Sequence, residues 1–480
     1  MGRLHKFGHV VIIYLSPFSR LPSPNSLAMT ASEPQPGQCG NLTDQQVAHL
    51  KELWVLMLDL FEQTVGGPEP ISTLSPHLGG PRTLSPTSST SSPPKKENKP
   101  ILGSMLYKVR PKRNQSTSTL SPPNPASPED SGEENDISSS TTPTTNPLNE
   151  IVAHFSGAQL HETFWNIVGT DNADGILLRF LRARKWDVQK AFHMCCATLK
   201  WRIDERVDEL VALGEVGIAE LLEKEDPGQG AAFLKQLESG KSYLGGPDKG
   251  GRPICFINVS LHHKEDQSLE TLKKFTVYTM ETARLFVDQP IETACIVFNM
   301  TDFSLACVDM EYVKFLISCF EAYYPESLGV CLVHHSPWIF STVWKLISPL
   351  LDPVVASKIH FTKTKEDLFE YIVPSRLPTY LGGTDSVKYI YVPPGPGEGL
   401  LAGPGNEAEK EARMESRRAV EMAYEAAVRR WVNETGTSAE MMTERKELAR
   451  KLRRERLKLE PYMRAPTYYH RKGMIKTVVD

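Results

Sequence analysis

The chain contains 480 residues, of which 40% are hydrophobic and 23% carry a charged side chain. Its 54 Lys and Arg residues nearly balance its 58 Asp and Glu residues, so the formal net charge is −4. This balance excludes a strongly basic protein that is held on nucleic acid by bulk charge. No run approaches the length of apolar sequence that crosses a bilayer, so we expect no membrane-spanning helix.

The eight cysteines lie mostly inside apolar runs and show no CxxC spacing, which predicts reduced, buried thiols in a cytosolic protein. The amino terminus holds the apolar run Val10–Leu15, which Arg3 and Lys6 precede. This run is about one residue short of a signal-peptide core. A second methionine, Met29, precedes a more ordinary start. We therefore interpret residues 1–42 as disordered, beginning with an unstructured extension or a misplaced start codon.

An amphipathic docking helix is predicted over residues 43–63. A cap signal at Asn41–Asp44 precedes apolar residues at helical spacing, which are Val47, Leu50, Leu53, Trp54, Met57, Leu60 and Phe61. Because one such helix cannot fold alone, we expect it to dock on the helical subdomain downstream. Residues 64–147 are predicted to be a disordered linker, since 35 of the 67 residues from Pro81 to Pro147 are Pro, Ser or Thr. Within it, Lys108–Arg113 is either a solvated basic patch or a targeting signal.

Residues 148–225 are predicted to form a helical amino-terminal domain. One helix ends near Val168, and a second begins at Asn172. Asp187 caps a third helix, whose apolar face consists of Val188, Ala191, Phe192, Cys195 and Leu199. These residues therefore supply a helical layer ahead of the rest of the fold.

Residues 226–385 alternate between strands and helices. Strands are predicted at 254–259, 295–298, 330–333 and 359–361, and helices at 269–287, 309–323 and 337–350. This alternation indicates crossover connections and a mixed, mostly parallel sheet in an α/β fold. Beyond it, the sequence predicts a Pro- and Gly-rich linker at 386–405 and carboxyl-terminal helices within 406–480.

A search for catalytic or metal-binding motifs finds none that is complete. Ser239–Ser242 lacks the first glycine of a phosphate-binding loop, and the chain has no GxSxG nucleophile elbow. His262-His263 and His334-His335 are adjacent pairs, and neighbours on a strand point to opposite faces. No cluster of His and Cys has zinc spacing. The sequence therefore predicts no catalytic residue, no metal and no cofactor, and it favours a binding protein.

The segment 336–351 is more apolar than an ordinary surface helix. Trp338 precedes a stripe at helical spacing, which consists of Phe340, Val343, Trp344, Ile347, Leu350 and Leu351. The segment is either a core helix or a lid over an apolar cavity that also meets a bilayer. Glu326 lies before the preceding strand and Lys358 after the helix, where they either pair with each other or hold a polar headgroup.

Six linked motifs resemble the CRAL-TRIO lipid-binding family and cover about residues 148–385. They are Leu177–Asp187, Asp248–Pro253, Tyr324–Glu326, Leu351–Pro353, Ser357–Ile359 and Tyr380–Gly383. His335–Phe340 and Tyr468–Arg471 are most similar to the branch of fungal phosphatidylinositol transfer proteins. The resemblance implies a sheet-floored apolar pocket closed by a mobile gate helix, here about 336–352, in which one lipid is held with its tails buried.

The same resemblance implies the binding residues. Family members hold the phosphoinositol headgroup with residues that match Arg184, Lys185, Glu326 and Lys358, although the first two also fit a solvated helix end and the last two an ordinary salt bridge. A threonine of the family site falls at Val355, so one hydroxyl contact is lost. The expected gate and pocket residues are those of the apolar segment, namely Trp338, Phe340, Val343, Trp344, Ile347 and Leu350.

The family's choline-lipid subsite is poorly matched. Its Ser and Thr fall at Ala294 and Ile296, which alternate on one strand face with Phe298 and form an apolar pocket wall. We infer that phosphatidylcholine is a poor ligand and that a sterol or squalene can be a second guest.

The resemblance therefore predicts a non-enzymatic protein that transfers phosphatidylinositol between membranes. The alternative is a lipid-sensing regulatory scaffold that presents the bound lipid to signalling or lipid-metabolism partners. We expect membrane lipids as partners, with transient peripheral membrane contact, no nucleic acid and a monomeric chain. We expect a cytoplasmic protein with peripheral association to endoplasmic reticulum, endosome or lipid-droplet membranes.

Overall fold

The computed structural model describes residues 34–63, 154–287, 290–395, 398, 405–434 and 438–476. All of them belong to one unit of the chain, which is made of residues 1–70 and 145–480. The amino-terminal apolar run, the linker at 64–147 and its basic island lie outside the described residues, so the expectations for them stay predictions.

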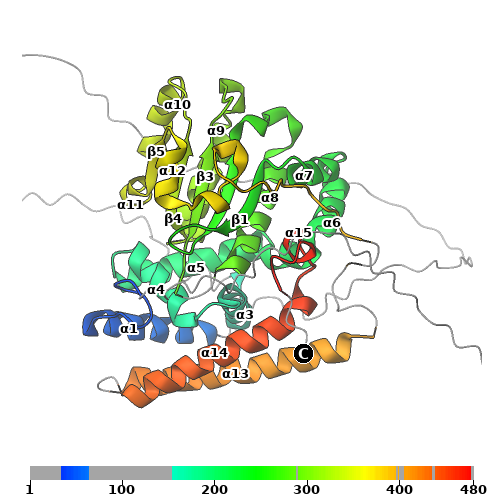
Figure 1. Cartoon of the computed structure of the whole chain (residues 1–480). Helices are drawn as coiled ribbons and strands as arrows, with labels where there is room; N and C mark the ends of the chain where they lie inside the picture. The colour runs from blue at the N-terminus through cyan, green and yellow to red at the C-terminus, as the bar shows by residue number, and fades with distance from the viewer. Residues whose placement is uncertain are drawn as a thin grey trace, which may run out of the picture. The chain divides into compact units, whose positions relative to one another are not determined.

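A five-stranded sheet has the strand order β1-β2-β3-β4-β5 (Figure 1). The strands are β1 Ser242–Pro247, β2 Pro253–Asn258, β3 Ala294–Asn299, β4 Leu328–His334 and β5 Ile359–Thr362. Only β1 and β2 pair antiparallel, and the other three pairings are parallel. The structure thus confirms the predicted α/β fold with a mostly parallel sheet. The sequence pattern misses β1, because two glycines and a proline obscure its strand character.

Helices follow the strands and cover the sheet. They are α8 Leu269–Ala283, α9 Met310–Ser318, α10 Phe340–Ile347, α11 Pro353–Ser357 and α12 Lys365–Tyr371. A 3₁₀ turn, Arg284–Phe286, continues α8, and a π-helical turn, Cys319–Tyr323, continues α9. α10 is shorter than the predicted 337–350 and passes into a 3₁₀ turn at Ser348–Leu350, where Pro349 limits the regular helix.

Both faces of the sheet are apolar, as strands that are covered on two sides require. Along β3, Cys295 and Val297 join the core that packs with α12. Ile296 and Phe298 point the other way and join the cluster that packs with α10. The α10 face is therefore the one that carries the predicted pocket wall.

The helical region precedes the sheet. It comprises α3 Gly157–Val168, α4 Ala173–Ala183, α5 Val188–Asp204, α6 Val207–Glu225 and α7 Gln229–Glu238. Side chains of Ser156, Asn172 and Asp187 accept hydrogen bonds from the first turns of α3, α4 and α5. These caps fix where each helix begins.

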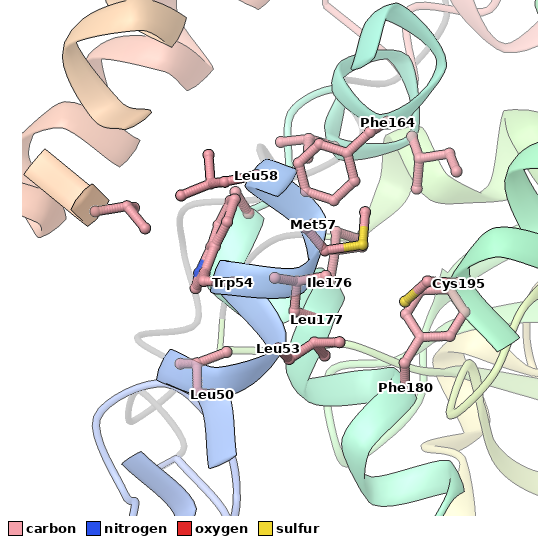
Figure 2. Close-up of a cluster of buried hydrophobic side chains, with 14 of the residues drawn as sticks. Leu50, Leu53, Trp54, Met57, Leu58, Phe164, Ile176, Leu177, Phe180 and Cys195 are labelled. Carbon is pink, nitrogen blue, oxygen red and sulfur yellow. The ribbon is translucent and has the colours of Figure 1, made fainter. Parts of the chain in front are cut away.

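The helix α1 (Asp44–Phe61) begins with a capping box between Thr43 and Gln46, and it packs against α3, α4, α5 and α13. Figure 2 shows Met57 and Leu53 facing the side chains of α4. Trp54 is fully buried, and its indole Nε1 donates to Asp174 at 2.8 Å. The helix thus docks on the helical region through both apolar burial and one directed hydrogen bond.

The carboxyl-terminal helices also pack on this region. α13 (Glu407–Asn433) and α14 (Ala439–Met463) form a hairpin, and Tyr424 and Trp431 of α13 lie in the same apolar cluster as α1 (Figure 1). Arg445 of α14 pairs with Asp174 and stacks on Trp431 at 3.6 Å. The last helix, α15 (Tyr468–Arg471), is tied to buried Glu215 by an Arg471 ion pair.

The burial of Trp54 gives a test of how firmly α1 docks. We expect Trp54→Ala to lower the free energy of unfolding of the full chain by about 3–5 kcal/mol, because it opens a cavity and leaves Asp174 without its indole donor. Val55→Ala is the matched control on the exposed side of α1 and should change it by about 0.5 kcal/mol or less. Denaturant unfolding measures both, and equal losses would contradict the docking.

Candidate functional site

An apolar cavity lies between the helical region and the sheet, at the end where β3 begins. Its empty volume is about 990 Å³, which includes the solvent-filled space at its open mouth. Ile176 and Phe180 of α4 line it from one side, and Ala294 and Ile296 of β3 line it from the other. An apolar cleft with a few polar groups at its edge is the usual kind of site for a small-molecule ligand.

The predicted gate residues lie beside this cavity rather than in its wall. Phe340 and Val343 are buried, and Trp344 and Ile347 are half-buried, in the cluster between α10 and the sheet. Ile296 belongs both to that cluster and to the cavity wall. The α10 side chains therefore cover the stretch of sheet face next to the cavity, so that the two form one continuous apolar surface. Phe298 lies under α10 and not in the cavity wall.

Two further residues of the predicted gate face outward. Trp338, just before α10, is 84% exposed, and Leu350, just after it, is 42% exposed. Leu346 on α10 and Val354 on α11 are also exposed. This end of the molecule thus carries apolar side chains on its outer surface as well as beneath it.

The structure brings Glu326 and Lys358 together. The Lys358 ammonium Nζ lies 3.5 Å from Glu326 Oε2, and both side chains are about three-quarters buried. The Lys358 carbonyl accepts from the backbone N–H of Cys331 at 2.8 Å, which fixes its position at the start of β5. A single ion pair of this length is loose, so either group can exchange it for bonds to a ligand.

Arg184 and Lys185 follow directly after α4. Arg184 Nη1 donates to the Ala183 carbonyl at 3.1 Å, and Lys185 is exposed. Among the residues that the structure describes, no hydrogen bond or ion pair joins these two cations to Glu326 or Lys358.

Two of the four predicted headgroup residues have a left-handed backbone. The φ angle is 52° at Lys185 and 54° at Glu326. A residue with a Cβ adopts this conformation at a cost of about 1–2 kcal/mol, and such strain is concentrated at functional sites.

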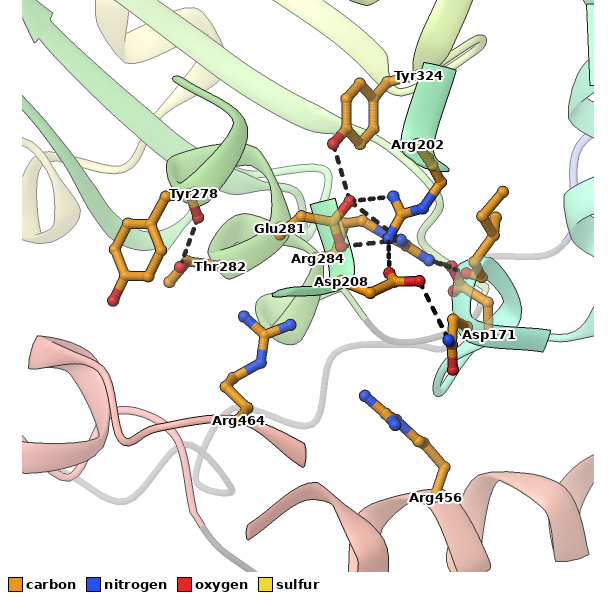
Figure 3. A network of polar contacts seen from close by, with 12 residues as sticks. Asp171, Arg202, Asp208, Tyr278, Glu281, Thr282, Arg284, Tyr324, Arg456 and Arg464 are labelled. Carbon is orange, nitrogen blue, oxygen red and sulfur yellow. Dashed lines mark hydrogen bonds and ion pairs between the residues drawn. The ribbon is translucent and has the colours of Figure 1, made fainter. Parts of the chain in front are cut away.

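A buried ionic network borders the cavity (Figure 3), and the sequence analysis missed it. Arg202 of α5 donates to Glu281 of α8 at 2.7 Å and to Asp208 at 2.7 Å. The Tyr324 hydroxyl donates to the same Glu281 carboxylate at 2.8 Å, and Arg284 lies 3.3 Å from it. These contacts join the helical region to α8 and to the segment that leads into Glu326.

The network keeps its carboxylate ionised. Burial alone would raise the pKa of Glu281, but the guanidinium groups of Arg202 and Arg284 outweigh it and hold the pKa well below its usual range. The stabilising contribution of Glu281 is therefore complete above its unfolded-state pKa of about 4.3 and is lost as the pH falls through the lower folded-state pKa.

A signal for this network exists in the sequence. Arg202 follows Leu199 by three positions, so it continues the apolar face of α5 with a charged residue. Glu281 follows buried Tyr278 of α8 by three positions in the same way. A charged residue on a buried helix stripe needs a partner, and each of these two helices carries one of opposite sign.

The site contains no cluster suited to a metal. Within the described ranges, no group of three or more His, Cys, Asp or Glu side chains is placed to hold a metal ion. The helices of those ranges also include none that is long and apolar enough to cross a bilayer.

Comparison with known proteins places these features in a family. The CRAL/TRIO domain matches residues 237–383, and the CRAL/TRIO N-terminal domain matches residues 134–196. A CRAL-TRIO domain-containing protein of Schizosaccharomyces pombe is 38% identical over 336 residues, which cover 68% of this chain and 71% of that protein. Phosphatidylinositol transfer protein CSR1 of Eremothecium gossypii is 32% identical over 453 residues, which cover 92% of this chain and 98% of that protein. The chain belongs to the CRAL/TRIO family.

This finding confirms the resemblance that the sequence motifs indicate, and it supports a lipid-binding or lipid-transfer function. A solved structure, described as the crystal structure of Sfh5, is 16% identical with a TM-score of 0.37 over 51% of this chain and 78% of that one. That likeness is too distant to carry an argument about function. The CRAL/TRIO matches end before α13, so α13, α14 and α15 lie outside both.

The Arg202 network predicts a large and specific loss of stability. We expect Arg202→Met to lower the free energy of unfolding by about 3–5 kcal/mol, because Glu281 then keeps its buried charge with one fewer partner. Lys200→Met, on the same helix, removes a partly exposed pair with Asp204 and should cost about 1 kcal/mol or less. Urea denaturation of the full chain at neutral pH compares them, and a similar small loss in both would contradict the role of the network.

Proposed function

We propose that this CRAL/TRIO protein binds phosphatidylinositol and carries it between membranes without chemical conversion, through an apolar pocket that α10 gates. The observation that carries the proposal is the apolar cavity between the helical region and the sheet, continuous with the cluster under α10. A CRAL/TRIO relative that covers nearly the whole chain is named a phosphatidylinositol transfer protein, which supports the choice of lipid.

The energetics of lipid extraction require such a cavity. Moving acyl chains from a bilayer into water costs about 0.8 kcal/mol for each CH₂ group exposed. A dry, preformed space removes that cost by replacing lipid contacts with protein contacts. The cavity supplies part of this space, and displacement of Phe340 and Val343 from the sheet face would supply more along the same surface.

The headgroup contacts follow from charge and position. Glu326 can accept hydrogen bonds from inositol hydroxyls, and Lys358 can pair with the phosphate once it leaves Glu326. Arg184 and Lys185 offer further positive charge for the phosphate. Val355 lies in the apolar cluster under α10 and offers no hydroxyl, so we propose that the inositol ring makes one contact fewer than in relatives with a threonine there.

Membrane contact is assigned to the outer surface around α10. Trp338, Leu346 and Leu350 are exposed there, and Trp is favoured where a polar phase meets hydrocarbon. Contacts between α10 and the sheet are apolar, so a bilayer can replace them without leaving polar groups unsatisfied. We propose that docking of this surface and opening of α10 occur together.

A test of the headgroup assignment uses the Glu326–Lys358 pair. We expect Glu326→Ala and Lys358→Ala each to reduce liposome-to-liposome transfer of labelled phosphatidylinositol by about tenfold or more, the effect of one charge-assisted hydrogen bond. Lys363→Ala removes an exposed cation shortly after Lys358 and should transfer at the wild-type rate. Equal rates in all four proteins would contradict the assignment.

Lipid selectivity gives a second test. We expect the double variant Ala294→Ser, Ile296→Thr to bind phosphatidylcholine about fivefold or more tightly than the wild type, because each hydroxyl adds a hydrogen bond worth about 1 kcal/mol to an apolar wall. Phosphatidylinositol binding should change little, since its headgroup is assigned elsewhere.

The matched control is Cys331→Ser, which adds a hydroxyl under α10 and outside the cavity wall. Competition binding with fluorescent phosphatidylcholine measures all three proteins. If the control alone gained phosphatidylcholine binding, the assignment of the choline-lipid subsite to Ala294 and Ile296 would be overturned. In the same assay, a sterol or squalene that competes for the wild-type cavity would identify an apolar second ligand.

A further inference from the structure

A second cavity, which is polar, lies behind the apolar one. Its empty volume is about 570 Å³, which includes the solvent-filled space at its mouth. The cavity opens between the helical region, the end of α8 and the end of α14. Asp171, Arg202 and Arg284 line both cavities, so these three residues form the wall between them. Two arginines from the carboxyl-terminal part, Arg456 and Arg464, line the polar cavity from the other side.

These two arginines carry buried hydrogen-bond donors that have no acceptor. Arg456 is 7% and Arg464 is 6% exposed. Within the described residues, Arg456 Nε and Nη1 and Arg464 Nη1 are buried without a hydrogen-bond partner. Figure 3 shows both side chains extending from the carboxyl-terminal ribbon toward the Arg202–Glu281 cluster. Buried donors of this kind are costly unless a ligand or water accepts from them.

The carboxylates of this cavity are already engaged. Glu460 lies 2.7 Å from Arg456 and 2.6 Å from Arg464. Asp208 and Glu281 pair with Arg202, and Asp171 pairs with Arg284. Glu460 Oε2 pairs with Arg456 but makes no hydrogen bond, so one carboxylate oxygen faces three unpartnered donor atoms of Arg456 and Arg464. A ligand with acceptor atoms would satisfy these donors.

A further buried arginine, Arg417, interacts electrostatically with Arg456. Arg417 of α13 is buried, donates to the Trp165 carbonyl and pairs with Glu421 at 2.8 Å. Its pKa is lowered to about 10, first by burial and then by the positive charge of Arg456. Arg417 and Arg456 thus repel each other, while Glu421 and Glu460 act in the opposite direction. An anion bound to Arg456 would reduce this repulsion further.

We propose that the polar cavity is a phosphate-binding site, in which Arg456 and Arg464 hold the phosphate oxygens. Arginine suits this role because its planar fork donates two hydrogen bonds to one phosphate group. The phosphate belongs either to a lipid headgroup that reaches through the shared wall or to a soluble phosphate compound. Arg456 and Arg464 lie outside the CRAL/TRIO matches, because they belong to α14 and its end, whereas Asp171 and Arg284 of the same cavity lie within them.

The test uses the full chain and inorganic phosphate as the probe. Isothermal titration calorimetry should show saturable binding to one site, and Arg456→Gln and Arg464→Gln should each weaken it by about tenfold or more. Arg454→Gln is the control, because it removes an exposed arginine on the same helix, and it should bind within about twofold of the wild type. Arg456→Lys keeps the positive charge beside Glu460, so it replaces Arg456→Gln as the test variant if that protein does not fold. It should also bind inorganic phosphate more weakly than the wild type.

A second titration identifies the source of the phosphate. If incubation with phosphatidylinositol vesicles abolishes the binding of inorganic phosphate, the site takes the phosphate of a lipid headgroup. If binding is unchanged, the site takes a soluble phosphate compound. Absence of saturable binding in the wild type overturns the proposal, and so does equal weakening by Arg454→Gln. The first titration uses the full chain after its bound lipid has been removed, so its outcome is independent of lipid transfer.

Discussion

The contact between Arg202 and Glu281 fixes how the helical region meets the sheet region. Each group is about 4% exposed, so each would be strongly unfavourable without the other. Arg284 and the Tyr324 hydroxyl complete the shell around the same carboxylate. Because these residues come from α5, α8, the turn after α8 and the segment before β4, the buried charge is satisfied only when all four elements are in place.

This constraint also positions the chemistry of the pocket. Tyr324 is two residues before Glu326, so its bond to Glu281 holds the strained turn that presents Glu326 to Lys358. The same arginines form one wall of the apolar cavity, while Ala294 and Ile296 form another. A lipid in this cavity would meet apolar side chains along most of its length and the buried ion pairs of Arg202 and Arg284 at one end. The apolar length of the cavity is the physical basis of the proposed function.

Sequence reasoning predicts elements whose pattern is local. The helix starts at Asn172 and Asp187, the four parallel strands and the stripe on α10 follow from caps and periodicity, and the structure contains them. Sequence reasoning fails where a residue's role depends on a partner that is distant in the chain. The pairing of Arg202 with Glu281 spans two elements, and the strand β1 is defined by its neighbour β2 more than by its own composition. The gate residues show both the success and the failure of local patterns. Their spacing predicts one apolar face, but only the structure separates buried Phe340 from exposed Trp338.

The central claim is that the apolar cavity holds a lipid. Native mass spectrometry of the full chain, purified under mild conditions and followed by identification of the extracted ligand, tests it most directly. The account predicts a complex of one chain with one lipid, with phosphatidylinositol as the main species and little phosphatidylcholine. A chain that carries no lipid, and takes none up from phosphatidylinositol vesicles, would contradict it.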